Sequence, residues 1–177
     1  MIENIKRMQK VKNIREIDIK DKRILIRVDF NVPLDSELNI NDDTRIREAI
    51  PTINYCIDNG AKSIILVSHL GRPKQRCEEF SLKTILKRLE RLLLKDIVFV
   101  DNLDNAQIIL NTLVDGSIIL LENIRFYEGE EKNDDNLSQK LANLCDIFIN
   151  DAFGTSHRKH SSTYGIAKYA KQKVAGL

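Results

Sequence analysis

Four arginines stand where apolar runs of this sequence give way to polar residues, or where a helical pattern begins. They are Arg45, Arg72, Arg125 and Arg158. A guanidinium group is a planar fork of hydrogen-bond donors whose geometry matches a phosphate or a carboxylate. Arginines held close together repel one another unless an anion lies between them. If the fold gathers these four side chains, they can bind a small ligand that carries about three negative charges.

Further polar residues accompany the arginines. The segment "VSHLGRPK" (67–74) adds His69, a potential cation, and Gly71, which lets the backbone turn tightly. Asp29 and Asn31 follow the run "RILIRV", and the segment "DAFGTSHRKHSS" (151–162) supplies two more histidines. Arg45 lies in the first turn of its expected helix, where a cation opposes the helix dipole and a bound anion would offset that cost.

Each of these residues also has a simpler interpretation. A single arginine at the end of a strand is more often a solvated or ion-paired surface residue than a ligand contact. Asp29 and Asn31 could shape the turn before Pro33, and Gly71 could be an ordinary turn residue. The histidines of "HRKH" could bind zinc, but no third ligand has a suitable spacing. The coincidence of several such segments, and not any one of them, favours an anion site.

Five short apolar runs, rich in Ile and Val, predict the strands that must position these residues. They are "RILIRV" (23–28), "SIILVS" (63–68), "IVFV" (97–100), "SIILL" (117–121) and "IFIN" (147–150). Their apolar residues are continuous, as in parallel strands with both faces covered. Helical patterns separate the runs, which predicts an α/β fold with a Rossmann-like parallel sheet between helices, in three layers (α/β/α). Because ligands bind beyond the carboxyl ends of parallel strands, the polar segments should meet at one edge.

The helical patterns have recognisable ends. Residues 43–58 repeat Ile at steps of three and four, and Gly60 is the expected stop. The residues expected to open the successive helices are Asp42 or Asp43, Ser81, Asp104, and Asn133 or Asp134.

The composition limits the class of protein and its partners. The 177 residues are 42% hydrophobic, which suits one globular domain with a core. A net charge of +2, only 6% aromatic residues and no Trp argue against nucleic-acid or membrane partners. The three cysteines, Cys56, Cys77 and Cys145, have no metal-ligand spacing and are expected to be reduced thiols. No signal peptide or long apolar segment is visible, so a cytoplasmic location is expected.

Two nucleotide-binding signatures are missing from the sequence. It contains neither G-x-x-x-x-G-K-[ST] nor G-x-G-x-x-G. An anion site without a nucleotide cradle indicates a binding module, a phosphatase or half of a transferase. A phosphatase of the aspartyl-phosphate type would need D-x-D after its first strand, whereas Asp29 is followed by Phe30 and Asn31, so the second carboxylate is missing. A non-catalytic anion-binding domain stays open as the other alternative.

The polar segments together resemble the motif series of the phosphoglycerate kinase family. "RVDFNVPLD", "DDTRIREAIPTI", "SHLGRPK", "LLENIRFYEGEEKND" and "INDAFGTSHRKHSS" match it in identity, order and approximate spacing, from Arg27 to Ser162. The resemblance implies a two-domain, monomeric enzyme that transfers a phosphoryl group reversibly between ATP and 3-phosphoglycerate in glycolysis and gluconeogenesis. Residues 1–177 would form only the N-terminal, substrate-binding domain, and the domain that binds Mg-ATP or Mg-ADP would be absent. The apolar ending "KQKVAGL" resembles the beginning of a new element, which also leads us to expect that the natural protein continues.

The resemblance also implies roles for individual residues. Asp29 and Asn31 would hydrogen-bond the glycerate end of the substrate, and Arg45 would be the catalytic residue beside the group that receives phosphate. The residues expected to hold the 3-phosphate end are His69, Arg72, Arg125 and Arg158, and Leu70 and Gly71 are also expected to belong to the substrate-binding site. No metal or cofactor site is expected in this chain, and the chain alone should bind 3-phosphoglycerate without catalysing its phosphorylation.

Overall fold

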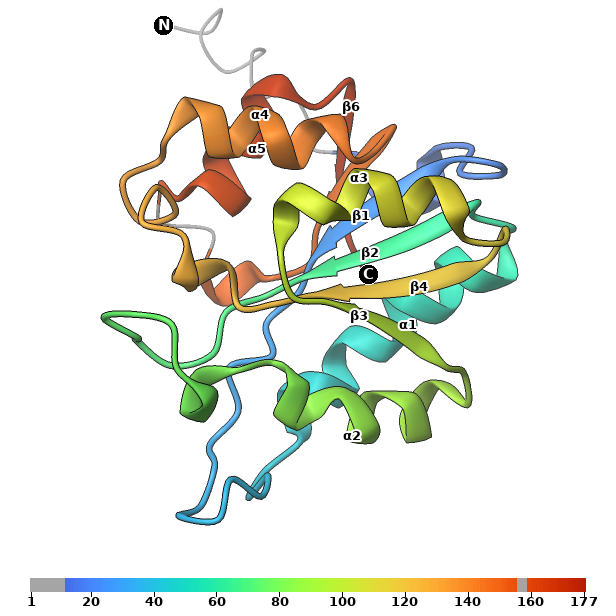
Figure 1. The fold of residues 1–177 in the computed structure, drawn as a ribbon. Helices are drawn as coiled ribbons and strands as arrows, with labels where there is room; N and C mark the ends of the chain where they lie inside the picture. Colours follow the sequence, from blue (N-terminus) through green and yellow to red (C-terminus); the bar gives the residue numbers. More distant parts are fainter. Residues whose placement is uncertain (1–11, 156–158) are drawn as a thin grey trace, which may run out of the picture.

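A computed structural model describes residues 12–155 and 159–177, which form a parallel sheet between two layers of helices (Figure 1). The sheet has six strands in the order β3-β4-β2-β1-β5-β6, and every neighbouring pair is parallel. The strands are β1 (Arg23–Arg27), β2 (Ser63–Val67), β3 (Ile97–Val100), β4 (Ser117–Leu121), β5 (Ile147–Asn150) and β6 (Gln172–Ala175). The five predicted strands are confirmed to within one residue. For β6, the sequence indicated only that a new element begins there.

The two faces of the sheet carry separate hydrophobic clusters because successive strand residues point to opposite sides. Ile24 and Ile26 of β1 pack with α1 (Thr44–Asp58) and α2 (Lys83–Leu93). Leu25, between them, packs on the other face with α3 (Leu103–Thr112), α4 (Asp135–Asn143) and α5 (Ile166–Tyr169). Figure 1 shows the two helix layers on either side of the strands. The predicted three-layer α/β/α fold is therefore confirmed.

The helix ends agree with the sequence pattern at some positions and differ at others. Asp134 caps α4 as predicted, and its side chain accepts a hydrogen bond from the amide of Leu137 at 2.8 Å. The prediction for α3 was wrong by two residues, because Asn102 is its N-cap and accepts from the amide of Asp104. Ser81 lies one residue before Leu82, the N-cap of α2. Its hydroxyl accepts from the amide of Lys83, the first residue of the helix, at 3.2 Å and donates to Glu122 at 2.6 Å.

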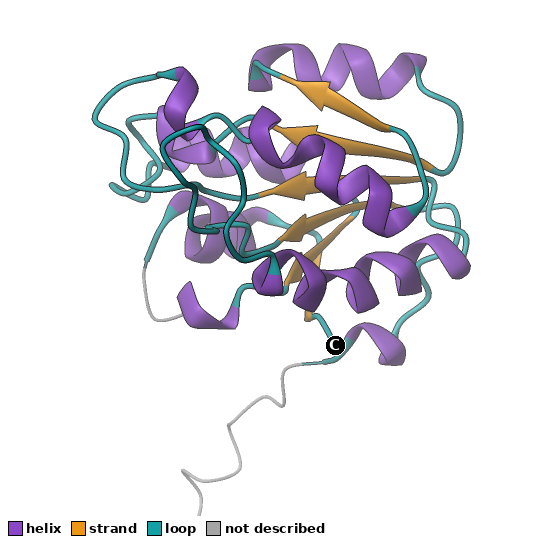
Figure 2. Cartoon of the chain, turned by 90° about the horizontal axis from the view of Figure 1, so that it is seen from below, coloured by secondary structure: helices purple, strands orange, loops and turns teal. Residues whose placement is uncertain are grey.

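The remaining elements are short turns, of which η2 precedes β1 and the others lie in segments that follow strands. The 3-10 turns are η2 (Ile14–Glu16), η3 (Glu78–Phe80), η4 (Ile124–Phe126) and η5 (Phe153–Thr155), and one π-helical turn, η6, spans Ser161–Gly165. Figure 2 shows the strand arrows pointing to one side of the molecule, where loops gather beyond their tips. In the described part of the chain, no helix has both the length and the apolar character needed to cross a bilayer.

Candidate functional site

A cavity of about 220 Å³ opens at the edge of the sheet where the strands end. The segments after β1, β2, β4 and β5 and the first turn of α1 all contribute to its wall. The residues that line it are Asp29, Asn31, Arg45, His69, Arg72, Arg125 and Gly154. The fold thus brings together side chains that are up to 125 positions apart in the sequence numbering, from Asp29 to Gly154. Arg158, which was predicted to join them, lies outside the described residues.

Arg125 and Asn31 hold the loop after β2 through the backbone of Gly71. The amide of Gly71 donates to Oδ1 of Asn31 at 2.8 Å, and Nη1 of Arg125 donates to the carbonyl of Gly71 at 2.6 Å. The Arg125 side chain is only 6% exposed, and its Nε lies 3.7 Å from Glu131. Leu70 does not line the cavity, because its side chain is buried in the core and its carbonyl accepts from Asn123. These contacts make the wall of the cavity a hydrogen-bonded frame.

Gly71 is needed at this position for two physical reasons. Its φ is +62°, in the left-handed region that residues with a Cβ rarely adopt. A Cβ on Gly71 would also lie 2.3 Å from Cε1 of Phe80, which is closer than atoms can approach. The glycine therefore permits both the tight turn and the packing of Phe80 beneath it.

Arg45 is held at the cavity by an acidic partner that also belongs to the site. Its Nη1 lies 2.5 Å from Oδ2 of Asp29, while Oδ1 of Asp29 accepts from the amide of Asn31 at 3.1 Å. The Arg45 side chain is still 48% exposed, so the guanidinium can contact a ligand as well as Asp29. The ion pair also offsets part of the cost of a cation in the first turn of α1.

His69 is buried and neutral, which differs from the cation that the sequence suggested. Burial lowers its pKa to about 2, and the positive charges of Arg27, Arg125 and Arg45 add to this effect. Its Nδ1 lies 3.1 Å from Nη2 of Arg27. A guanidinium can only donate, so Nδ1 accepts and the proton of the imidazole is on Nε2. The expectation that His69 adds positive charge was wrong, and the ring is a neutral hydrogen-bond donor.

Arg27 is a residue that the sequence reasoning missed. It ends β1, is 1% exposed, and its side chain points to the face of the sheet that α4 and η6 cover. Its Nε donates to the hydroxyl of Ser162 at 2.8 Å, and Nη1 donates to the carbonyl of Val28. Burial lowers its pKa, and the charges of Glu130 and Asp29 oppose that shift. The signal that could have identified it is an arginine that stands between the apolar residues Ile26 and Val28 of the predicted strand.

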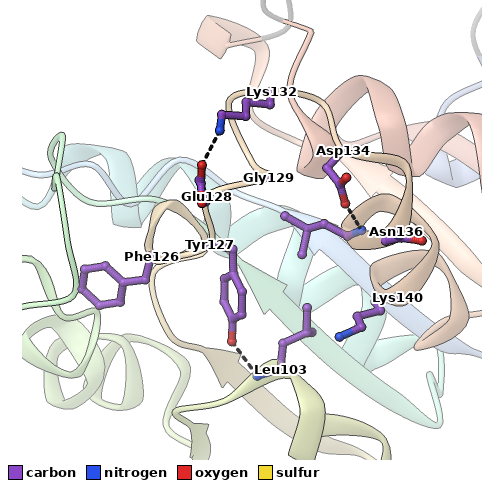
Figure 3. Close-up of a pocket in the computed structure, with 10 residues that line it drawn as sticks. Leu103, Phe126, Tyr127, Glu128, Gly129, Lys132, Asp134, Asn136 and Lys140 are labelled. Atoms are coloured by element: carbon purple, nitrogen blue, oxygen red, sulfur yellow. Dashed lines mark hydrogen bonds and ion pairs between the residues drawn. The ribbon is translucent and has the colours of Figure 1, made fainter.

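A second, larger cavity of about 540 Å³ lies between α3, α4 and the segment after η4 (Figure 3). Several of its polar groups already have partners in the protein. The hydroxyl of Tyr127 accepts from the amide of Leu103 at 2.7 Å, Lys132 pairs with Glu128, and Lys140 pairs with Asp104. Among the described residues, none of those predicted for the anion site lines this cavity, and its two lysines already have acidic partners.

The geometry of the first cavity therefore suits a small anion. Three arginines and a neutral imidazole donor converge on it, while Asp29 and Asn31 offer oxygen atoms that can accept from a hydroxyl group. Within residues 12–155 and 159–177, no three His, Cys, Asp or Glu side chains are arranged to hold a metal ion.

Comparison with known proteins gives a consistent result. The family model described as phosphoglycerate kinase matches residues 14–177. A phosphoglycerate kinase from Wolinella succinogenes is 67% identical over 177 residues, which is 100% of this chain and 44% of that protein. One from Helicobacter pylori is 63% identical, again over 100% of this chain and 44% of the relative. The chain thus spans less than half the length of these curated relatives.

Solved structures agree with the sequence comparison. The structure of phosphoglycerate kinase from Coxiella burnetii matches with a TM-score of 0.85 and 37% identity over 94% of this chain and 42% of that one. Phosphoglycerate kinase from Pyrococcus horikoshii matches with a TM-score of 0.82 and 28% identity over 93% of this chain. These matches favour a kinase over the phosphatase alternative, and the chain belongs to the phosphoglycerate kinase family.

Proposed function

We propose that this chain is the N-terminal, 3-phosphoglycerate-binding domain of a phosphoglycerate kinase. The observation that carries the proposal is the cavity at the carboxyl edge of the sheet, where Arg45, Arg72 and Arg125 converge with His69. Family membership supports the substrate class. The nucleotide, as Mg-ATP or Mg-ADP, would bind in a part of the protein that this chain does not include. The absence of both glycine-rich phosphate signatures from the sequence and the 44% coverage of the relatives support that division.

The reaction would need little covalent chemistry from these residues. A carboxylate oxygen of 3-phosphoglycerate attacks the γ-phosphorus of ATP, an acyl phosphate forms, and ADP leaves with the electron pair of the broken bond. Positioning of the two substrates and stabilisation of charge dominate such phosphoryl transfers. Closure of the two domains would bring donor and acceptor into line and exclude water.

The described residues can divide this work between the two ends of the substrate. Arg72 and Arg125, with Arg158 as predicted, would hold the 3-phosphate, and the Nε2 proton of His69 would add a neutral donor. Asp29 and Asn31 would accept from the hydroxyl group of the glycerate. Arg45, the more exposed arginine of the Asp29 pair, would stabilise the migrating phosphoryl group.

Calorimetric titration with 3-phosphoglycerate tests the binding half of the proposal. The 177-residue chain should bind one equivalent and should show no turnover when ATP is added. Arg125→Ala should weaken binding, since each charge-assisted hydrogen bond contributes on the order of 1.5–3 kcal/mol. Failure of the folded chain to bind 3-phosphoglycerate, or turnover of ATP by the chain alone, would contradict the proposal.

Steady-state kinetics of the full-length enzyme test the division of roles. Arg45→Ala should lower kcat by about 10²–10³, the usual cost of removing a donor aimed at transition-state charge. Arg125→Ala should mainly raise the KM for 3-phosphoglycerate, because its side chain binds the end of the substrate that does not react. Equal losses of kcat with unchanged KM in both variants would show that the roles are not divided in this way.

The remaining expectations about the protein stay predictions. They are a monomeric state, a cytoplasmic location, and the absence of nucleic-acid or membrane partners. The resemblance to the family supports the monomeric state, the reduced cysteines expected from the sequence support the location, and the low net charge argues against nucleic-acid or membrane partners.

A further inference from the structure

A hydrogen-bonded network of four buried polar side chains lies beneath the anion cavity. It runs from His69 through Arg27 and Ser162 to Glu130. The carboxylate oxygen Oε1 of Glu130 lies 2.5 Å from the hydroxyl of Ser162, and Oε2 accepts from the amide of Ser162 at 2.9 Å. The same hydroxyl accepts from Nε of Arg27 at 2.8 Å, and Nη2 of Arg27 contacts Nδ1 of His69. Glu130 and Arg27 are each 1% exposed, and Ser162 is fully buried. Of the four, only His69 lines the cavity.

The donor and the acceptor of each hydrogen bond between these four side chains can be assigned from their chemistry. The guanidinium of Arg27 can only donate, so the hydroxyl oxygen of Ser162 must accept from it. The single hydroxyl proton of Ser162 is then donated to Glu130, both of whose oxygens act as acceptors. Burial raises the pKa of Glu130, while the two bonds from Ser162 and the charge of Arg27 oppose that shift. Because both oxygens accept, the geometry fits the ionised carboxylate, whose charge balances the buried charge of Arg27. At the other end, Arg27 determines which nitrogen of His69 carries the proton.

Glu130 also joins segments that follow different strands. Its carbonyl accepts from the amide of Ser161 at 2.9 Å, and the hydroxyl of Ser161 donates to the neighbouring Gly129 carbonyl at 2.9 Å. Its carboxylate lies 3.8 Å from Nδ1 of His160. The residue therefore links the segment after β4 to the segment after β5 directly, and to β1 through Arg27.

We propose that Glu130 is a positioning residue for anion binding, which acts through Ser162 and Arg27 to present the Nε2 proton of His69 to the ligand. Glu130 does not line the cavity and is not a catalytic residue. The identity of the ligand as 3-phosphoglycerate rests on the proposed function, whereas the orientation of His69 does not.

The direction in which one substitution changes the anion affinity distinguishes this positioning role from a purely electrostatic one. Glu130→Gln removes a negative charge close to an anion site, and by electrostatics alone the anion should bind more tightly. A glutamine, however, can accept only one of the two bonds from Ser162, because its other terminal atom is a donor. The hydrogen-bonded network would then be broken, so the positioning role predicts weaker binding of the anion.

The experiment uses the 177-residue chain, labelled with ¹⁵N, and two readouts. Long-range ¹H–¹⁵N spectra at pH 6.5 show which nitrogen of His69 is protonated, and the other two histidines are assigned by His157→Gln and His160→Gln. Calorimetry gives the affinity for 3-phosphoglycerate and for sulfate. The variants are Glu130→Gln and Ser162→Ala. The matched control is Glu128→Gln, the same change at a side chain that is 86% exposed.

The expected result is a neutral His69 with its proton on Nε2 in the unmodified chain and in the control. Glu130→Gln and Ser162→Ala should both change the ¹⁵N signature of His69 and weaken anion binding by about 10- to 100-fold, the usual effect of losing a hydrogen bond to a charged group. Unchanged or tighter binding in the two variants would overturn the proposal, as would a charged or Nδ1-protonated His69 in the unmodified chain. If Glu130→Gln does not fold, the smaller Ser162→Ala change decides.

Failure of the proposed function and failure of the role proposed for Glu130 give different results in this experiment. A chain that binds sulfate but not 3-phosphoglycerate would contradict the proposed substrate, while the variants would still test positioning with sulfate. If the chain binds neither anion, the ¹⁵N signature of His69 still decides whether Glu130 controls its orientation.

Discussion

Substitution of Gly71 by alanine should lower both the free energy of unfolding and the affinity for the anion. The loss of stability has two physical causes, the backbone conformation and a steric clash. Gly71 has φ of +62°, and a left-handed residue with a Cβ costs about 1–2 kcal/mol. The added Cβ would also lie 2.3 Å from the ring of Phe80, and relief of such overpacking costs typically another 1–3 kcal/mol. The total loss in the free energy of unfolding should therefore be about 2–5 kcal/mol.

Gly116 provides a matched control for the backbone term. Its φ is +84°, but nothing lies within 4 Å of a Cβ placed there, and it precedes β4 at the opposite edge of the sheet. Gly116→Ala should lose only the backbone term of about 1–2 kcal/mol. Phe80→Ala provides the second test, because without the ring Gly71→Ala should cost no more than Gly116→Ala does.

Urea unfolding followed by circular dichroism measures these losses, and calorimetry measures anion affinity. Gly71→Ala should weaken anion binding at least tenfold, since the displaced loop loses its bonds to Asn31 and Arg125 and each charge-assisted bond contributes on the order of 1.5–3 kcal/mol. Gly116→Ala should leave the affinity unchanged. The reasoning is refuted if Gly71→Ala destabilises the chain no more than Gly116→Ala, or if it binds the anion as tightly as the unmodified chain.

Two further predictions concern groups whose pKa is shifted by burial. Burial raises the pKa of Asp151 to about 6, so its stabilising contribution is complete below pH 4 and is lost as the pH rises through 6. Asp151→Asn should remove this loss and raise the free energy of unfolding at pH 8, relative to pH 4, by about 1–2 kcal/mol after allowance for partial exposure; equal pH dependence in both proteins would contradict this. Burial also raises the pKa of the Cys56 and Cys145 thiols to about 12. Iodoacetamide at pH 8 should therefore label only Cys77 among the three cysteines until urea is added. Mass spectrometry of the labelled peptides measures this, and labelling of Cys56 or Cys145 before urea is added would contradict the prediction.

Much of the architecture follows from local sequence pattern. Short, continuous apolar runs rich in Ile and Val, such as "SIILV", are typical of central strands of a parallel sheet, and the intervening amphipathic segments can then cover its two faces. Parallel strands joined by helices all end at the same edge, so residues as distant as Arg45 and Arg125 could be predicted to meet. The strand β6 is less apparent, because its residues are partly exposed and its pairing with β5 depends on the rest of the sheet.

The sequence by itself therefore determined the layers, the parallel sheet and the edge where the cationic residues gather. The tertiary structure decided the protonation and the hydrogen-bond partners of those residues. His69 is neutral because burial and Arg27, which is 42 positions away, disfavour its charge, and Arg27 is itself oriented by Ser162, 135 positions away. Periodicity depends on neighbours along the chain and can be read from it. Protonation and hydrogen-bond direction depend on solvent exclusion and on charges a few ångströms away, which only the folded chain brings together.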